Sequence, residues 1–204
     1  MPMQPNIKID LEEIIGSGQP LILEIGCGPN KKTGRIGIDH IDFPDVDIVA
    51  DMENGLPFLP DSSVDEIHCR SVLEHIDNFE NLMKEIVRVL KADGRAHIFV
   101  PHFSNPYSYS DYTHKRHFGL YTFYYFVENR KQLKRKVPDF YSSIRIEILS
   151  LKLVFRSPFW ISKQLKKVLG AVFNCHRSVM EFYEQHLCYL FPCYGIEIVF
   201  KPVK

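Results

Sequence analysis

The chain of 204 residues has no long hydrophobic run, no internal repeat and no net charge. No apolar stretch approaches the roughly 20 residues that a membrane-spanning helix needs. Its 11 glycines and 13 prolines follow no period, which excludes collagen-like and low-complexity chains. With 45% hydrophobic and 25% charged residues the composition is that of a globular protein, and the length predicts a single domain.

The five cysteines include no Cys-x-x-Cys pair. An odd number of cysteines without close pairing argues against a disulfide framework and against a thiolate zinc site. We therefore expect reduced, mostly buried thiols. The segment 1–10 has prolines and alternating polarity where a signal peptide would have basic residues and a continuous apolar stretch, so we expect a cytoplasmic protein.

The charges are divided unevenly along the chain. Residues 1–100 carry 9 Lys and Arg against 18 Asp and Glu, whereas residues 101–204 carry 16 against 7. The two halves therefore have opposite net charges of −9 and +9. This division suggests that the first half faces a cation or a polyol and the second an anion, or that the halves complement each other.

The order of the predicted elements points to a parallel sheet. Short apolar runs predict strands at 20–25, 35–39, 47–51, 64–69 and 95–100, followed by strands at 143–155 and 195–201. Apolar residues at helical spacing predict helices at 78–90, near 121–136 and within 159–190. This alternation predicts a doubly wound, Rossmann-like α/β fold with a mostly parallel, seven-stranded sheet and an antiparallel C-terminal edge strand.

The first predicted strand runs directly into a Gly-x-Gly turn at Gly26–Gly28. Glycine lets the backbone turn without a Cβ clash and lets a ligand lie against the main chain. Asp39 ends the next strand, where its carboxylate can accept both hydroxyls of a ribose, and Asp51 ends the third, near the place of an adenine. Because the carboxyl ends of parallel strands share one edge of the sheet, these residues together predict a nucleoside site.

A series of motifs follows in order along the first half of the chain: Leu23–Gly28, Gly37–Asp39, Asp51, Leu56–Asp65, Ser71–Ile76, and Glu85–Leu90 followed by Asp93 and Gly94. This series resembles the class I S-adenosylmethionine-dependent methyltransferases, most closely the type 11 subgroup. The resemblance covers about residues 20–102, and the ordered series is more specific than any one motif. It implies S-adenosylmethionine as the cofactor, bound by the 20–102 half of a single domain spanning 1–204. Residues 103–204 would form the acceptor-side half, with a helical insertion at about 156–192.

The resemblance also assigns roles to residues at the strand ends. It implies that Gly26, Cys27 and Gly28 hold the methionine part of the cofactor and that Asp39 holds the ribose. The other cofactor-binding residues that it implies are Glu24 at the cofactor amine, His40 next to Asp39, Asp51 and Met52 at the adenine, and Arg70 and Ser71 flanking the sulfonium.

The chain departs from the family in the crossover at 29–34, where the family has a full helix. Members associated with sugar and cell-surface polysaccharide pathways have a similarly brief loop. Lys31 or Lys32 could replace lost backbone contacts to the cofactor carboxylate, although we favour two solvated loop lysines. A nicotinamide cofactor is disfavoured, because Lys31 stands where a dinucleotide motif has its third glycine.

The loop at 102–118 is rich in Tyr, Ser and His and follows the fifth strand, where this fold closes over its acceptor. Methyl transfer requires positioning of the acceptor, and an oxygen acceptor usually also needs a base. We predict His75, His114 and His117 as the catalytic residues, with His102 as a further candidate. The alternative is that these histidines order the local structure.

A metal ion is a weaker hypothesis for the same loop. The spacing of Asp111, His114 and His117 is compatible with one, but polar loop residues fall into such spacings by chance, and we predict no metal.

Two segments of the second half are basic. We interpret the run at 130–136 as the charged end of the 121–136 helix and not as a nucleic-acid surface. In the segment 160–173, three lysines stand opposite an apolar stripe formed by Ile161, Leu165, Val168, Leu169 and Val172. We expect this stripe to pack in the core or against a second copy in a homodimer, and we rank contact with an anionic membrane lower.

These observations favour an S-adenosylmethionine-dependent methyltransferase that acts on a small-molecule acceptor, with a sugar or cell-surface saccharide intermediate as the specific hypothesis. The fold does not fix the substrate. The alternative is a non-catalytic S-adenosylmethionine-binding or scaffold protein of the same fold. Methylation of nucleic acid or protein ranks third, since the chain has no Asn/Asp-Pro-Pro-Tyr-like motif.

Overall fold

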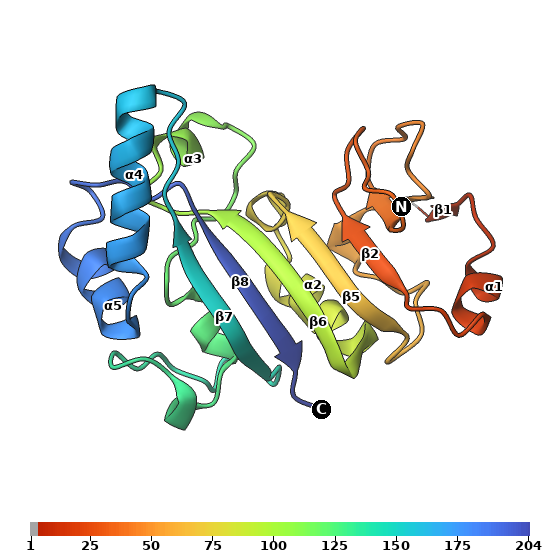
Figure 1. Ribbon diagram of the computed structural model, residues 1–204. Helices are drawn as coiled ribbons and strands as arrows, with labels where there is room; N and C mark the ends of the chain where they lie inside the picture. The colour runs from red at the N-terminus through yellow and green to blue at the C-terminus, as the bar shows by residue number, and fades with distance from the viewer. Residues whose placement is uncertain (1–3) are drawn as a thin grey trace.

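A computed structural model describes residues 4–204, which form an eight-stranded sheet with helices around it (Figure 1). The strands are β1 (Asn6–Ile7), β2 (Ile22–Ile25), β3 (Ile36–Asp39), β4 (Ile48–Val49), β5 (Val64–Arg70), β6 (Leu90–Pro101), β7 (Ile146–Val154) and β8 (Gly195–Pro202). The α-helices are α1 (Leu11–Gly16), α2 (Phe79–Val89), α3 (Pro106–Ser110), α4 (Trp160–Phe173) and α5 (Arg177–His186). Short 3₁₀ helices are η1 (Met52–Asn54), η2 (Leu73–His75), η3 (Thr122–Phe126) and η4 (Asn129–Lys131).

The strand order is β1-β4-β3-β2-β5-β6-β8-β7. The strands from β4 to β6 in this order run parallel to one another, and β8 runs antiparallel to both of its neighbours. The predicted doubly wound fold is confirmed. The C-terminal strand β8 is antiparallel as predicted, but it lies one position inside the edge of the sheet, and β7 is the edge strand. The short strand β1, antiparallel to β4, is an eighth strand that was not predicted. The chain order reverses between β2 and β5, and at such a point ligands bind beyond the carboxyl ends of the strands.

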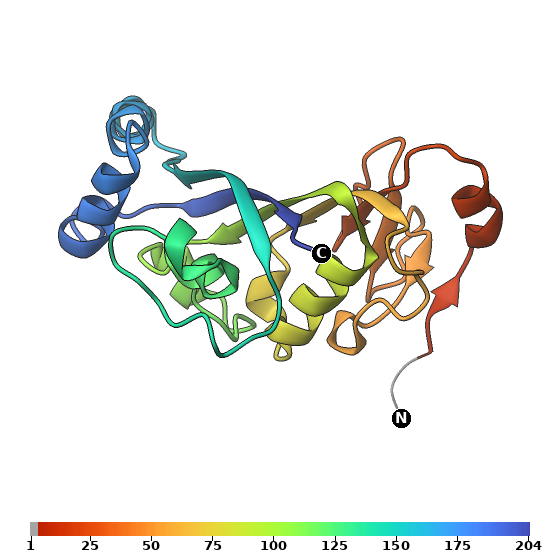
Figure 2. The same ribbon diagram turned by 90° about the horizontal axis from the view of Figure 1, so that it is seen from below.

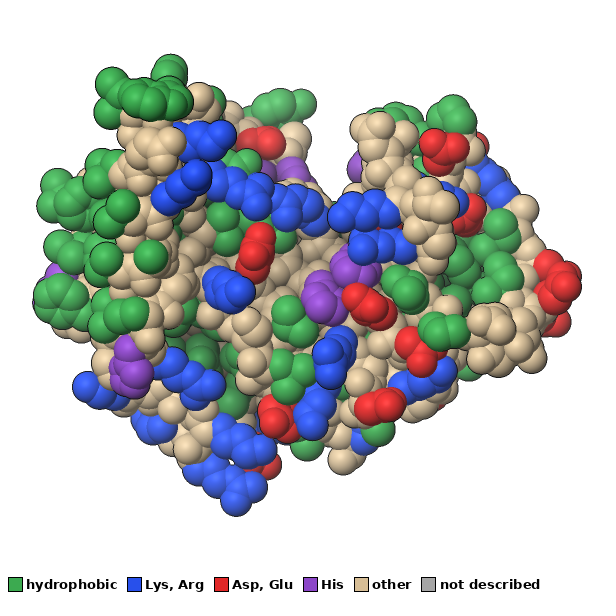
Figure 3. All heavy atoms as spheres, viewed as in Figure 1, with side chains coloured by type: hydrophobic (Ala, Val, Ile, Leu, Met, Phe, Trp, Pro, Cys, Tyr) green, Lys and Arg blue, Asp and Glu red, His purple; other side chains and the backbone are tan. Residues whose placement is uncertain are grey.

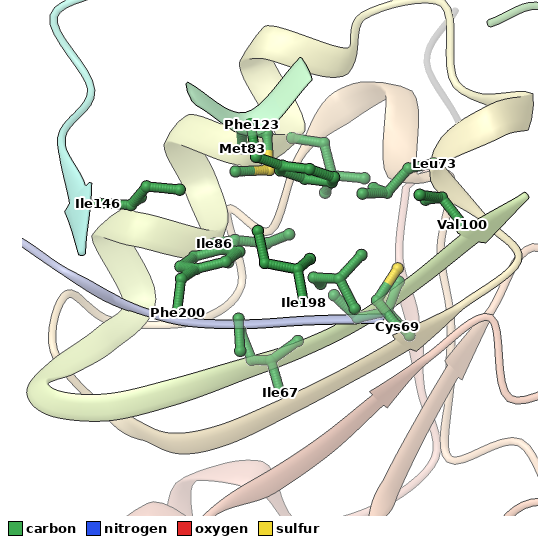
Figure 4. Close-up of a cluster of buried hydrophobic side chains, with 14 of the residues drawn as sticks. Ile67, Cys69, Leu73, Met83, Ile86, Val100, Phe123, Ile146, Ile198 and Phe200 are labelled. Atoms are coloured by element: carbon green, nitrogen blue, oxygen red, sulfur yellow. The ribbon is translucent and has the colours of Figure 1, made fainter. Parts of the chain in front are cut away.

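The main core lies between the sheet and α2. Apolar residues at helical spacing put one face of α2 against the sheet, and Met83 and Ile86 are fully buried there. They meet inward-facing residues of the strands, among them Ile67 and Ile198, and Phe123 closes the far side (Figure 4). In the view from below, α2 and the segment after β6 lie on one side of the sheet (Figure 2). This packing fixes the strand ends that carry the candidate site.

The opposite face of the sheet is open over its central strands. The links from β2 to β3 and from β3 to β4 contain no helix that could cover it. Polar side chains occupy this face instead: the rings of His68 and His97 stack 4.8 Å apart, and both have Nε2 within 3.1 Å of Glu66 Oε1. Figure 3 shows histidine and charged side chains spread over this face. The uncovered face is the structural consequence of the short crossover seen in the sequence.

The helix predicted near 121–136 is wrong. Only η3 and η4 form there, and the rest of the segment is irregular. The side chain of Gln132 satisfies backbone groups that a helix would pair with each other. Its amide nitrogen donates to the carbonyls of Tyr124 and Val127, and its oxygen accepts from the Val137 N–H. The basic run at 130–136 is therefore not the end of a long helix; Lys136 caps the carbonyls of Asn129 and Gln132.

The predicted helical insertion consists of α4 and α5, which lie at the β7 edge of the sheet (Figure 1). The expected core packing of the α4 stripe is wrong for most of its members. Ile161 is 78% exposed and Val168 is 59% exposed, whereas Leu169 packs partly against the core and Phe173 is buried. Of the three lysines, only Lys166 turns inward, where it is half-buried over the ring of Phe155, whereas Lys163 and Lys167 are exposed. The apolar face of α4 thus lies on the surface.

All five cysteines are free thiols, and only Cys175 is exposed, as expected. Among residues 4–204, the helices are all too short or too polar to cross a bilayer.

Candidate active site

The turn after β2 requires glycine at its first position. Gly26 has φ +67°, and a Cβ there would lie 2.1 Å from Cγ2 of Val72, the residue that follows β5 by two positions. The N–H groups of Gly26 and Cys27 both donate to the carbonyl of Ile38. The close approach of Val72 and this pairing hold the ends of three strands together, so that side chains from β2, β3 and β5 surround one space.

That space is a cleft of about 750 Å³ at the carboxyl edge of the sheet. The space-filling view shows the molecule hollowed at this edge (Figure 3). Six of the ten predicted cofactor-binding residues line the cleft, namely Gly26, Asp39, His40, Asp51, Met52 and Ser71. The sequence pattern thus brought residues from four separate segments to one cavity.

Two carboxylates in the cleft are held by backbone hydrogen bonds. Asp39 is only 6% exposed and accepts from the N–H groups of Gly28 and Ile41, at 2.8 and 3.0 Å. Asp51 accepts from the N–H of Glu53 and caps η1. Each carboxylate has further lone pairs, so both are fixed acceptors that can still bind hydroxyl or amine hydrogens of a ligand.

Four predicted cofactor-binding residues do not line this cleft. Gly28 supports Asp39 through its N–H. Cys27 packs away from the cleft in a small apolar cluster, where burial first and then Asp39 and Glu24 raise the pKa of its thiol to about 11. Glu24 and Arg70 line an adjoining hollow of about 250 Å³ that shares Gly26 with the cleft, and the Arg70 guanidinium lies 4.1 Å over the ring of Phe99.

The crossover lysines also have defined positions. Lys31 is not a solvated lysine, because its Nζ lies 2.7 Å from Asp47 Oδ2 in a half-buried ion pair. Its aliphatic chain and the Cys27 thiol fill the space beside Gly37, where a Cβ would come within 2.8 Å of either. The backbone N–H of Lys32 donates to Glu24, and Lys32 is exposed, as expected, at the rim of the hollow that contains Arg70.

A second cavity of about 630 Å³ lies next to the cleft. The two cavities share Ser71 and His75 in their linings. Ser71 has φ +55°, a strained conformation for a residue with a side chain, and such strain is concentrated at functional sites. We call this second cavity the acceptor hollow. Its other polar lining residues come mainly from the 102–118 loop, including Tyr107, Asp111 and His114.

His75 and His114 come together although 39 positions separate them. Their ring centroids are 4.8 Å apart. His114 Nδ1 lies 2.9 Å from the carbonyl oxygen of Ser108, which can only accept, so Nδ1 carries the proton. His75 Nδ1 lies 3.0 Å from Thr113 Oγ1, whose own hydroxyl donates to Asp111, so His75 also donates through Nδ1. Both rings therefore keep the lone pair on Nε2 free.

Glu74 is a site residue that the sequence analysis missed. It is 1% exposed and lines the acceptor hollow, and burial raises the pKa of its carboxyl to about 7. Its Oε2 is buried without a hydrogen-bond partner, as is Oγ of Ser108 in the same hollow. Orphaned buried polar atoms are rare in folded proteins and call for an explanation. In the sequence, Glu74 stands out only as part of the Leu73–His75 helix start that resembles the family's motif.

The other two histidine candidates lie elsewhere. His102 is fully buried, with Nδ1 2.8 Å from Ser104 Oγ and Nε2 3.1 Å from Glu184, so it is a structural residue. His117 is exposed and lies against the ring of Tyr109, outside the lining of both cavities. The prediction of His117 as a catalytic residue therefore lacks support from the geometry, as does the weaker hypothesis of a metal ion held by Asp111, His114 and His117.

The 111–116 segment is clamped onto η2. The N–H groups of Lys115 and Arg116 both donate to the carbonyl of Glu74, and the Arg116 guanidinium donates to the carbonyls of Ile76 and Asp77. These contacts bring His114 to His75 and close one side of the acceptor hollow.

Residues 33–98, about a third of the chain, match the family model described as a methyltransferase domain. The fold is similar to a SAM-dependent methyltransferase from Archaeoglobus fulgidus, at 20% identity over 95% of this chain and 92% of that one, with a TM-score of 0.53. It is also similar to the YcgJ protein from Bacillus subtilis, at 16% identity over 95% and 97% of the chains, with a TM-score of 0.52. A comparison with curated proteins gave no match. At these identities the structural likeness shows the fold alone, and the family match covers residues 33–98.

Proposed function

We propose that this chain is a class I S-adenosylmethionine-dependent methyltransferase that binds its cofactor in the cleft around Asp39 and methylates a small molecule bound in the acceptor hollow. The family match and the fold support the first part of this proposal. One observation carries the proposal: the two cavities meet at Ser71 and His75. A methyl group presented from the cleft at this point can reach an acceptor atom in the hollow.

The orientation of the cofactor follows from the chemistry of the cleft. Asp39 and Asp51 offer fixed acceptors at one end, which suit the ribose hydroxyls and the adenine amine, with Met52 beside them. Gly26 lies where the cleft joins the hollow that contains Glu24 and Arg70. These two opposite charges suit the amine and the carboxylate of the methionine part, so the sulfonium would lie between the ends, near Ser71.

The acceptor hollow suits a polyhydroxylated molecule. Its lining combines aromatic faces, such as that of Tyr107, with hydroxyl, imidazole and carboxylate groups. Aromatic faces stack on sugar rings and the polar groups bind hydroxyls. Arg156, in the same lining, adds a cation that would complement an anionic substituent such as a phosphate. A sugar or cell-surface saccharide intermediate is therefore the acceptor class that we propose.

The chemical step is an in-line displacement. The acceptor oxygen forms a bond to the methyl carbon while the carbon–sulfur bond breaks, and its electron pair stays on sulfur to give S-adenosylhomocysteine. The acceptor hydroxyl must also lose its proton. His75 and His114 are the groups positioned to promote that loss, since both line the hollow and keep the lone pair on Nε2.

A binding comparison tests the cofactor assignment. Asp39→Ala should weaken binding of S-adenosylmethionine by about 2 kcal/mol, or about 30-fold, because it removes a charged acceptor for two hydroxyls. Asp42→Ala is the matched control, since that carboxylate is exposed and pairs only with Lys8. Equal affinities of the two variants would remove the ribose assignment.

A second test separates an enzyme from a non-catalytic cofactor-binding protein. Incubation with S-adenosylmethionine labelled in its methyl group and a panel of sugars, nucleotide sugars and lipid-linked saccharides should label one acceptor class. His114→Ala should abolish this labelling while cofactor affinity stays unchanged. Cofactor binding without any labelling would favour the non-catalytic alternative.

A further inference from the structure

We propose that Glu74, His75 and His114 form a binding site for one divalent transition-metal ion in the wall between the cofactor cleft and the acceptor hollow. The position of this ion beside the acceptor rests on the proposed function, whereas the binding of the ion depends only on the three side chains.

The first support is the distance between the donor atoms. One carboxylate oxygen of Glu74 and one ring nitrogen from each histidine all lie within 4.8 Å of one another. Donors that coordinate one ion at about 2.0–2.2 Å are somewhat closer together than this. Shifts of the donor atoms by about 1 Å, on the order of the movements that usually accompany binding, would bring them to coordinating distance of one ion.

The second support is the orientation of the rings. A histidine that binds a metal through Nε2 usually donates its Nδ1–H to a carbonyl or another polar group, which fixes the tautomer. Both rings show this arrangement: His114 donates to the Ser108 carbonyl, and His75 donates to Thr113, which is in turn bonded to Asp111. Both imidazoles therefore keep an Nε2 lone pair available to bind an ion.

The third support is the buried carboxylate. Glu74 Oε2 has no hydrogen-bond partner among the described residues and is shielded from solvent. A carboxylate in such a place is costly unless it is paired or coordinates a metal. Lys115 and Arg116, whose backbone N–H groups bind the Glu74 carbonyl, have their side chains engaged elsewhere: the Lys115 ammonium pairs with Asp77 and Glu53, and Arg116 donates to backbone carbonyls. Arg156, which also lines the hollow, lies 3.7 Å from Glu197. A divalent cation would supply the missing partner.

The donor set also indicates which ion binds. Two imidazole nitrogens and one carboxylate oxygen suit Zn²⁺, Mn²⁺, Fe²⁺ or Co²⁺, whereas Mg²⁺ and Ca²⁺ prefer oxygen ligands alone. Asp111 Oδ2, 3.6 Å from His114 Nε2, adds negative charge beside the site. With three protein ligands, coordination positions remain open, and all three ligands line the acceptor hollow.

An open coordination position would bind the acceptor oxygen. Coordination lowers the pKa of a bound hydroxyl, so its proton passes to water and the oxygen is left as the nucleophile for methyl transfer. The ion keeps its oxidation state throughout. His75 and His114 would then promote loss of the acceptor proton as ligands of the ion instead of as bases.

The test is titration of the chelator-treated protein with Zn²⁺ in a calorimeter. The expected result is one ion per chain with micromolar or tighter affinity, weakened at least tenfold by Glu74→Gln, His75→Ala or His114→Ala. The matched control is His117→Ala, three positions along the same loop and outside the cluster, which should leave the affinity unchanged. Substitution of Co²⁺ should give visible absorption bands that His114→Ala removes and His117→Ala keeps.

A second control concerns the other histidine pair. His68→Ala should also leave the affinity unchanged, because His68, His97 and Glu66 lie on the open face of the sheet. Absence of binding, or a loss caused by His68→Ala or His117→Ala but not by His114→Ala, would overturn the metal site. S-adenosylmethionine affinity is measured on the same samples: retained cofactor binding without metal binding refutes only this inference, whereas loss of cofactor binding in the untreated protein refutes the proposed function.

Discussion

Gly26→Ala should destabilise the protein through an overlap with Val72 and through backbone strain. The new Cβ would lie 2.1 Å from Cγ2 of Val72, and the backbone at φ +67° would be strained for alanine. The left-handed conformation costs about 1–2 kcal/mol, and relief of the overlap by movement of Val72 costs about 1–3 kcal/mol more. We therefore expect the free energy of unfolding to fall by about 2–5 kcal/mol.

Gly28→Ala provides the matched control. Gly28 has nearly the same conformation, φ +58°, but no atom lies within 4 Å of its Cβ position, so only the conformational cost of about 1–2 kcal/mol applies. In the double variant Gly26→Ala/Val72→Ala, the nearest remaining atom would be the Val72 Cβ at 3.4 Å, an ordinary contact. The clash should then disappear.

A double-mutant cycle measures this contact by urea unfolding of the unchanged protein, Gly26→Ala, Val72→Ala and the double variant. The Gly26→Ala and Val72→Ala effects should be less than additive by about 1–3 kcal/mol, which is the overlap contribution. If Gly26→Ala were as mild as Gly28→Ala, or if the two changes were strictly additive, the close approach of Val72 to the turn would not be what requires glycine.

Other regions of the chain give further expectations. Arg88→Ala should lower the free energy of unfolding, measured in urea, by about 2–3 kcal/mol, because Arg88 binds Glu85, Asp61 and the carbonyls of Leu56 and Leu59. A change below about 0.5 kcal/mol, the level of an ordinary surface substitution, would contradict this network. Leu165→Ala, on the exposed face of α4, should lower the free energy of unfolding by less than about 0.5 kcal/mol, and Phe173→Ala, on its buried face, should lower it by about 3–5 kcal/mol. Similar values for the two variants would mean that α4 packs the other way round. In the metal-free protein, burial raises the pKa of Glu74 to about 7, so the folded state favours the protonated carboxyl. As the pH rises from 4.5 through 7, the free energy of unfolding should therefore fall by about 3 kcal/mol relative to that of Glu74→Gln. Parallel pH profiles of the two proteins would show that the carboxyl is not desolvated.

The cofactor half of the fold could be predicted because its signals are local. Each parallel strand is a short apolar run that ends in glycine or aspartate, and the carboxyl ends of such strands must share one edge. For that reason Gly26, Asp39 and Asp51 could be assigned to one cavity from the sequence alone. The direction of a side chain relative to the sheet was less accessible: Arg70 and Ser71 are adjacent, yet only Ser71 lines the cleft.

The acceptor side was harder to predict because tertiary contacts decide it. His114 and His117 are equivalent in a loop sequence, and only the bond from His114 to the Ser108 carbonyl and the clamp on Glu74 distinguish them. Glu74 becomes a site residue only when the 111–116 segment, nearly 40 positions away, covers it. The aromatic segment after Tyr121 has helical spacing, but Gln132 satisfies its backbone in another way.

The central claim is that the cleft at Asp39 binds S-adenosylmethionine. Calorimetric titration of the purified protein with S-adenosylmethionine, S-adenosylhomocysteine and NAD tests it most directly. The account predicts 1:1 binding of the first two ligands in the micromolar range and no binding of NAD. Failure to bind either sulfur ligand, or binding of NAD in their place, would contradict it.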